Sequence, residues 1–127
     1  MGWKIDVDEI IKRDLEKALK NFDLFLDVCK KQNIKVTKRD KEVIIQMITT
    51  MAENFFEIID TPDNNPLDFY IDNSGMLGVE DRKGTRYDFI SHPTKFLRNL
   101  RKDIKKGLLK YLNLLSSHKI EVKWEDT

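Results

Sequence analysis

Residues 67–90 read LDFYIDNSGMLGVEDRKGTRYDFI and contain three short runs with strand character, separated by two polar links. Gly75 and Gly84 lie late in these links, and a glycine there suits a hairpin loop of three or four residues. Apolar residues alternate along the runs and would share one face of a sheet, namely Phe69, Ile71, Leu77, Val79, Tyr87 and Phe89. This stretch therefore predicts a three-stranded antiparallel meander whose apolar face needs a helix to cover it.

Two helices are predicted before the meander. A cluster of helix breakers at residues 61–66 lies between these helices and the meander. Apolar residues recur every three or four positions over residues 7–29 and again over residues 44–59, as on one face of a helix. Thr37 and Asp40 supply a side-chain cap and an acid three residues later, which predicts the start of the second helix. We therefore expect an N-terminal antiparallel helical hairpin over residues 6–60.

A third amphipathic helix, basic on its polar side, is predicted over residues 94–116, with Pro93 tolerated at its start. Gly107 lies inside this helix and should weaken it by about 1 kcal/mol relative to alanine. Residues 119–124 alternate strictly between apolar and polar, which predicts a C-terminal edge strand. Residues 3–7 alternate as well, so they either pair with that strand, in a parallel or an antiparallel register, or lead into the first helix.

The length is that of one domain, and the predicted elements make it a single α+β domain over residues 1–127. No apolar stretch approaches the roughly 20 residues that a membrane span requires, and the N-terminus lacks an apolar signal core, so we expect a cytoplasmic protein without membrane contact. Cys29 is the only cysteine, which excludes an internal disulfide and a cysteine-based zinc site. Its apolar neighbours predict that it is a core residue.

Charge is distributed unevenly along the chain. The 23 Lys and Arg residues nearly balance the 22 Asp and Glu residues, for a net charge of +1. Yet residues 42–81 contain 9 acidic and no basic residues, whereas residues 82–119 contain 11 basic and 2 acidic ones. Such asymmetry favours a charged partner. The alternative is that the fold lays the two blocks against each other and neutralises them.

The basic block supports the leading functional hypothesis, a small non-enzymatic binding or regulatory protein that contacts nucleic acid phosphates. The candidate nucleic-acid-binding residues are Lys95, Arg98, Arg101, Lys102, Lys105, Lys106 and Lys110 on the third helix, with Arg82 and Lys83 in the preceding turn. Few aromatic residues interleave with these cations, so phosphate contact is favoured over base stacking. A helix-turn-helix over residues 26–47 is less favoured, because the long helices and the extra residues before Thr37 suit a plain hairpin.

The acidic block supports an alternative, a protein-binding inhibitor or adaptor of the kind that phages and mobile elements carry. Its candidate residues for contact with a basic protein are Glu53, Glu57, Asp60, Asp63, Asp68, Asp72, Glu80 and Asp81. Complementary charge would mainly speed and orient association with such a partner. A homodimer is also compatible with the sequence, since a helical hairpin can complete its core against a second copy.

A metal-dependent nuclease is the third and weakest hypothesis. Pro62-Asp63 followed by Asp81-Arg82-Lys83 superficially resembles the motif of the PD-(D/E)xK nucleases, in which carboxylates hold Mg²⁺ and a lysine positions the attacking water. Arg82, however, stands between the second acid and the lysine, where that motif has an apolar residue. His92 and His118 lie about 39 Å apart if the third helix is continuous, so they cannot share a site. We expect no catalytic residue, metal or cofactor.

Overall fold

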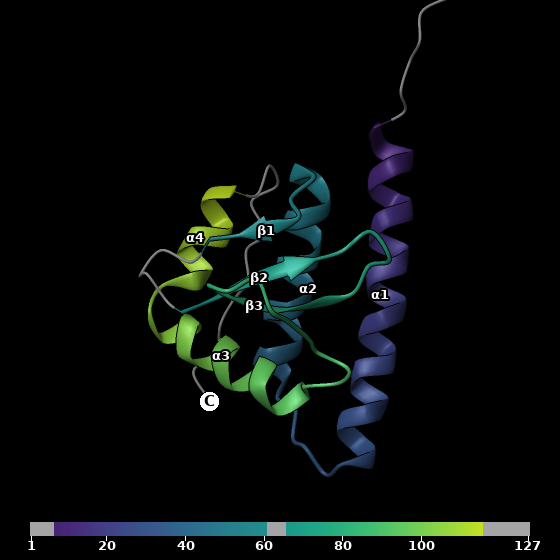
Figure 1. Ribbon diagram of the computed structural model, residues 1–127. Helices are drawn as coiled ribbons and strands as arrows, with labels where there is room; N and C mark the ends of the chain where they lie inside the picture. The colour runs from purple at the N-terminus through teal and green to yellow at the C-terminus, as the bar shows by residue number, and fades with distance from the viewer. Residues whose placement is uncertain (1–6, 61–65, 116–127) are drawn as a thin grey trace, which may run out of the picture.

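The computed structural model describes residues 7–60 and 66–115, which form four helices and a four-stranded antiparallel sheet (Figure 1). The helices are α1 (Val7–Lys31), α2 (Lys38–Asn54), α3 (Pro93–Lys105) and α4 (Leu108–Leu115), and the strands are β1 (Ile58–Ile59), β2 (Leu67–Ile71), β3 (Leu77–Asp81) and β4 (Arg86–Asp88). The predicted α+β class is confirmed. The strand expected at 119–124, and its pairing with residues 3–7, involve segments outside the described residues. No described helix has the length and apolarity to cross a membrane.

The sheet is the predicted meander with one strand added, in the order β1-β2-β3-β4. Phe69 of β2 pairs with Val79 of β3, and Val79 pairs with Tyr87 of β4, so these residues share one face. Phe69, Val79 and Leu77 of this face are fully buried, as the alternation predicts. Ile59 of β1 pairs with Phe69 and is buried beside it.

α1 and α2 form the predicted hairpin, with α1 running down one side of the molecule and α2 returning beside it (Figure 1). The capping box at the start of α2 is confirmed, because the Asp40 N–H donates to Thr37 Oγ1 at 3.1 Å and the Thr37 N–H donates to Asp40 Oδ2 at 2.9 Å. The predicted end near residue 60 is wrong. α2 ends at Asn54, because Phe55 adopts the left-handed conformation with φ 55° and its N–H bonds to the Met51 carbonyl.

The single helix predicted over residues 94–116 is also wrong. Gly107 has a φ of 102° and divides this stretch into α3 and α4, which run in different directions (Figure 1). The break lets both helices bury leucines in the same core, Leu100 from α3 and Leu108 and Leu112 from α4. The separation expected for the two histidines assumed one continuous helix and no longer applies, and His118 lies outside the described residues.

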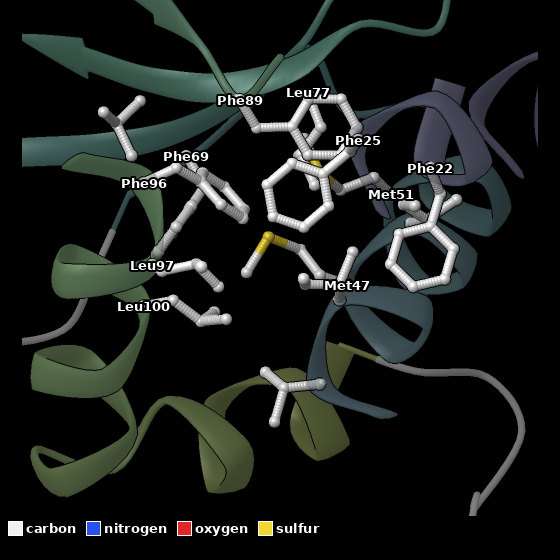
Figure 2. Close-up of a cluster of buried hydrophobic side chains, with 14 of the residues drawn as sticks. Phe22, Phe25, Met47, Met51, Phe69, Leu77, Phe89, Phe96, Leu97 and Leu100 are labelled. Carbon is white, nitrogen blue, oxygen red and sulfur yellow. The ribbon is translucent and has the colours of Figure 1, made fainter. Parts of the chain in front are cut away.

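The core lies where α1, α2 and α3 meet the apolar face of the sheet, and Figure 2 shows its centre. The Phe25 ring of α1 stacks on Phe89 with 4.6 Å between ring centroids, and Phe96 of α3 packs edge-on against both rings. Cys29 is 1% exposed, which confirms its place in the core. Burial raises the pKa of the Cys29 thiol above its ordinary value.

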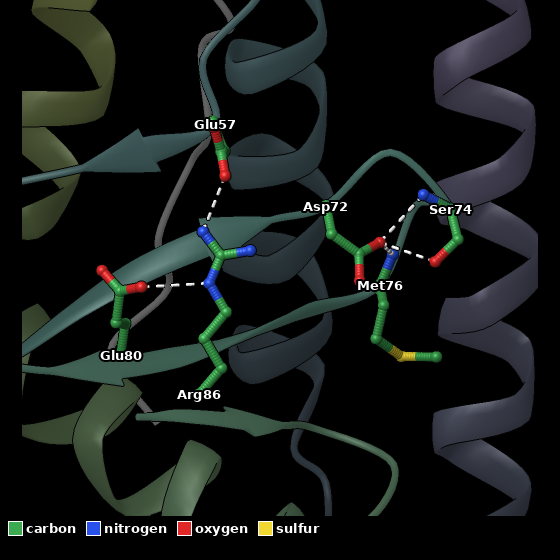
Figure 3. Close-up of polar contacts among 6 residues, drawn as sticks. All are labelled: Glu57, Asp72, Ser74, Met76, Glu80 and Arg86. Carbon is green, nitrogen blue, oxygen red and sulfur yellow. Dashed lines mark hydrogen bonds and ion pairs between the residues drawn. The ribbon is translucent and has the colours of Figure 1, made fainter. Parts of the chain in front are cut away.

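The turn between β2 and β3 packs directly on α1. Gly75 in this turn has a φ of 77°, and a Cβ atom there would lie 2.8 Å from the backbone nitrogen of Ala18. Asn21 Nδ2 donates to the Ser74 carbonyl at 3.0 Å. The Asp72 carboxylate closes the turn by accepting the N–H and the hydroxyl of Ser74 (Figure 3). Glycine is therefore required at position 75 both for the backbone conformation and for the approach to α1.

Candidate nucleic-acid interface

The solvent-facing side of α3 is basic over the whole length of the helix. Its exposed residues include Lys95, Arg98, Arg101, Lys102 and Lys105, while Phe96, Leu97, Leu100 and Ile104 are buried. This division follows the helical period of 3.6 residues, with apolar side chains packed on the core and cations directed outward. The cations are thus held on a helix that the core keeps in place.

A shallow groove of about 420 Å³ lies along this side of α3 and is called the α3 groove below. It is lined by Ile34, Thr94, Leu97, Arg98, Arg101, Lys102 and Lys105. Ile34 belongs to the loop between α1 and α2, so two segments far apart in the chain form the groove. Its lining combines the apolar residues Ile34 and Leu97 with four cations of α3.

An ion pair with α2 holds Arg101 at the edge of this groove. Arg101 Nη2 lies 2.7 Å from Asp40 Oδ2 and also donates to the Lys35 carbonyl at 2.9 Å. The Asp40 side chain is 3% exposed and that of Arg101 is 46% exposed. Burial alone would raise the pKa of Asp40, but hydrogen bonds from Arg101 and Thr37 outweigh burial and hold this pKa below its ordinary value. Asp40 is therefore ionised at neutral pH and offsets the charge of Arg101.

The other cations of the groove have no such counter-charge. Arg98, Lys102 and Lys105 form no ion pair with another described residue. Lys95, nearer the start of α3, places its Nζ 4.3 Å from the centre of the Tyr87 ring. The α3 groove therefore has a net positive charge, to which Arg98, Lys102 and Lys105 contribute most.

The remaining predicted basic residues do not line this groove. Lys106 is the C-cap of α3, and Lys110 lies beyond the Gly107 break on α4. Arg82 and Lys83 lie in the exposed turn between β3 and β4. The predicted stripe of seven cations along one helix is therefore divided, and four of its members come together in the groove.

The acidic block is partly neutralised inside the molecule. Arg86 donates to Glu57 Oε1 at 2.7 Å and to Glu80 Oε1 at 3.0 Å (Figure 3). These hydrogen bonds raise the pKa of Arg86. The acidic and basic blocks of the sequence thus meet at Arg86. Arg101 of the α3 groove pairs instead with Asp40, which belongs to neither block.

Other acidic candidates serve the turns or lie on different elements. Asp72 and Asp81 each accept backbone N–H groups of the turn that follows them. Glu53 is half-buried at the end of α2, Asp68 is half-buried on β2, and Asp60 is exposed beside β1. Asp63 lies outside the described residues.

Asp81, the second acid of the nuclease-like motif, is thus a turn-closing residue, and the described residues contain no group of three His, Cys, Asp or Glu that could hold a metal ion.

Sequence reasoning missed the second wall of the α3 groove. Ile34 and the Lys35 carbonyl come from a loop that lies more than fifty residues before α3, and only tertiary packing brings them there. A weak signal was present, because Lys35, Lys38, Arg39 and Lys41 form a basic run around the predicted cap of α2. Comparison with known proteins finds no matching family model, no matching curated protein and no matching solved structure.

Proposed function

We propose that the chain is a small regulatory binding protein that contacts the phosphates of double-stranded nucleic acid through the α3 groove. The observation that carries this proposal is the position of Arg98, Lys102 and Lys105, three neighbouring cations on one exposed helix face that form no ion pair with the described part of the chain. Cations in such an array bind phosphates by displacing the condensed counterions of the nucleic acid. The Asp40–Arg101 pair would act as a positioning contact that keeps α3 beside the 34–37 loop.

The groove favours a duplex over a single strand. None of the described residues that line it is aromatic, so it offers no platform on which successive bases could stack. Contacts to phosphates orient a protein on the duplex but carry no sequence information. We therefore expect sequence-independent affinity, with a Kd on the order of 10⁻⁴ to 10⁻⁶ M at physiological salt.

The test is fluorescence anisotropy with labelled DNA and RNA duplexes of about 20 base pairs across a range of salt concentrations. Three phosphate contacts predict that log K falls with log salt concentration with a slope of about −3. In the double variant Arg98→Glu/Lys102→Glu, affinity should fall at least about tenfold, and the slope should shrink by about 2. The matched control is Lys12→Glu/Lys20→Glu, which makes the same charge change at exposed positions of α1.

Two outcomes would refute the proposal. One is the absence of duplex binding at low salt. The other is an equal loss of affinity in both double variants, because that result would reflect the net charge of the protein and not the α3 groove.

Protein binding by the whole acidic block has weaker support. Glu57 and Glu80 are paired with Arg86, and the carboxylate of Asp81 closes a turn. Three of the candidate carboxylates are thus engaged in contacts within the chain. Two residues of the block, Glu57 and Asp72, line a pocket beside α1 together with apolar side chains.

A further inference from the structure

The pocket beside Glu57 and Asp72 has a volume of about 270 Å³ and is lined by the end of α2, the β2–β3 turn and the N-terminal half of α1. Ile48 and Met51 of α2 and Ile71 of β2 supply apolar lining. The charged residues Asp14, Lys17, Glu57 and Asp72 and the aromatic residues Phe55 and Phe56 also line it. We call it the Phe55 pocket, and it shares no lining residue with the α3 groove.

The size and chemistry of the Phe55 pocket suit a single long side chain. Pockets for small molecules commonly have volumes of roughly 300 to 1,000 Å³, so this one lies at the lower end of that range. Its lining combines apolar side chains with carboxylates, and an Arg or Lys side chain has the complementary pattern of an apolar stem and a cationic end.

The charged lining residues favour a cation. Asp14 and Glu57 are exposed, and Asp72 is half-buried at the same site. Burial alone would raise the pKa of Asp72, but hydrogen bonds from Ser74 and Met76 outweigh it and hold this pKa below its ordinary value. Glu57 is also paired with Arg86, and Lys17 is the one cation that the structure places in the lining. Because Arg86 offsets the charge of Glu57, the carboxylates of Asp14 and Asp72 against the one ammonium group of Lys17 leave the lining with a net negative charge.

Phe55 adds an exposed aromatic ring to the lining of this pocket. Its φ of 55° lies in the left-handed region, where an L-residue other than glycine is disfavoured by roughly 1–2 kcal/mol. Helices commonly end with glycine or asparagine in this conformation. The Phe55 side chain is 60% exposed, so burial within the chain offsets little of that strain. An exposed aromatic ring beside carboxylates can, however, contact a cation through its face.

We propose that the Phe55 pocket receives an Arg or Lys side chain from an exposed segment of a partner protein. The stem of that side chain lies over the apolar lining, and its cation lies between Asp14 and Asp72, beside the Phe55 ring. Arginine is favoured, since its planar fork can bond a carboxylate in a bidentate manner and arginine is enriched among the residues that dominate protein interfaces. This interaction would be independent of the α3 groove.

The experiment selects binders from a random twelve-residue peptide library displayed on phage, with the full chain as the immobilised target. We expect the enriched peptides to share an arginine or lysine whose replacement by glutamine lowers affinity at least about tenfold. Anisotropy of the labelled winning peptide should show a comparable loss with Phe55→Gly, a variant that relieves the backbone strain and so keeps the fold. Asp14→Lys should weaken binding as well.

Two matched variants control for general effects. Leu24→Ala removes another exposed apolar side chain, 50% exposed on α1, and Asp23→Lys reverses another exposed charge on the same helix. Neither should change peptide affinity by more than about twofold. Arg98→Glu/Lys102→Glu should also leave peptide binding intact, so that failure of the α3 proposal and failure of this one can be told apart.

Several results would overturn the proposal. These are no enriched peptide, enriched peptides that share no basic residue, or equal losses in the Phe55→Gly and Leu24→Ala proteins. Free arginine methylamide that binds as tightly as the peptide would assign the pocket to a small molecule. A dimer in sedimentation velocity that Asp14→Lys dissociates would assign it to a second copy of the chain.

Discussion

Arg101 of α3 donates two hydrogen bonds to Asp40 of α2, a nearly buried carboxylate 61 positions earlier in the chain. The same carboxylate accepts the N–H of Thr37 at 2.9 Å and so completes the capping box of α2. One side chain therefore closes the start of one helix and fixes the position of another. Together with the buried side chains of α3, this contact holds the basic face beside the loop that contains Ile34.

Removing the guanidinium should leave the Asp40 carboxylate buried with only its contacts to Thr37. Arg101→Met is expected to lower the free energy of unfolding by about 2 kcal/mol, between the values typical of buried and exposed pairs, because Arg101 is 46% exposed. The double variant Asp40→Asn/Arg101→Met should lose less than the sum of the single losses. Urea denaturation measures all three, with Arg98→Met as the control for an exposed arginine of α3. Strictly additive losses would contradict a direct interaction.

The ion pair between Asp40 and Arg101 should also make the unfolding free energy depend on pH in acid. The folded pKa of Asp40 is lowered from 3.8, so its contribution is present in full above the unfolded pKa and is lost as pH falls through the folded pKa. Stability should therefore decrease below about pH 4. Asp72, whose pKa is also lowered, should contribute to the same decrease. Urea unfolding between pH 2 and 6 should show that the unfolding free energy of Asp40→Asn decreases less steeply with falling pH than that of the unmodified protein. If the two free energies fall in parallel, the lowered pKa of Asp40 is contradicted.

Two turn glycines allow backbone strain to be separated from steric contact. Gly75 has a φ of 77° and lies against the α1 backbone, whereas Gly84 has a φ of 82° with no atom within 4 Å of an added Cβ. Gly84→Ala should cost about 1 kcal/mol of unfolding free energy from the left-handed conformation alone. Gly75→Ala should cost about 3 kcal/mol, because its Cβ also collides with Ala18. Equal losses in thermal or urea unfolding would mean that the turn does not pack on α1 as closely as described.

The parts of the fold that depend on local patterns were predictable. Alternation in residues 67–90 predicts the buried face of the sheet, and Thr37 with Asp40 predicts the cap of α2. The end of α2 was missed because Phe55 is an unusual residue for the left-handed position and the pair of isoleucines in β1 also fits a helical period. The basic side of α3 follows from its sequence. The groove and the Phe55 pocket do not, because each joins segments that only the packed core brings together.

Gly107 determines whether residues 94–115 form one helix or two. Its φ is 102° and an added Cβ would meet no atom within 4 Å, so Gly107→Ala adds backbone strain without a collision. We expect a loss of about 1 kcal/mol in unfolding free energy and no gain in helix content, because Leu108 and Leu112 are buried only if the chain turns. Far-ultraviolet circular dichroism and urea unfolding test this. A rise in both helicity and stability would indicate that alanine converts the segment into the continuous helix predicted from sequence.

Tyr70 lies on the face of the sheet opposite the apolar core, yet it is only 3% exposed. Gly78 leaves room for it, since a Cβ there would lie 2.7 Å from Tyr70 Oη, and the Arg86 guanidinium lies 4.6 Å from the centre of the Tyr70 ring. Burial first, and then the negative charges of Asp88 and Asp72, raise the pKa of Tyr70 to about 12, while Arg86 acts in the opposite direction.

Because the folded pKa of Tyr70 exceeds its ordinary value of 10.0, the resulting stability is complete below about pH 10 and is lost as pH rises through the folded pKa. Absorbance at about 295 nm should show one phenol that titrates near pH 12, provided the protein is still folded there, and Tyr70→Phe should remove that component. Arg86→Gln should move the same component to higher pH, since it removes the positive charge that favours the phenolate. If Tyr70→Phe instead removes a component near pH 10, the phenol is solvated, and the packing of Arg86 and Gly78 around it is wrong.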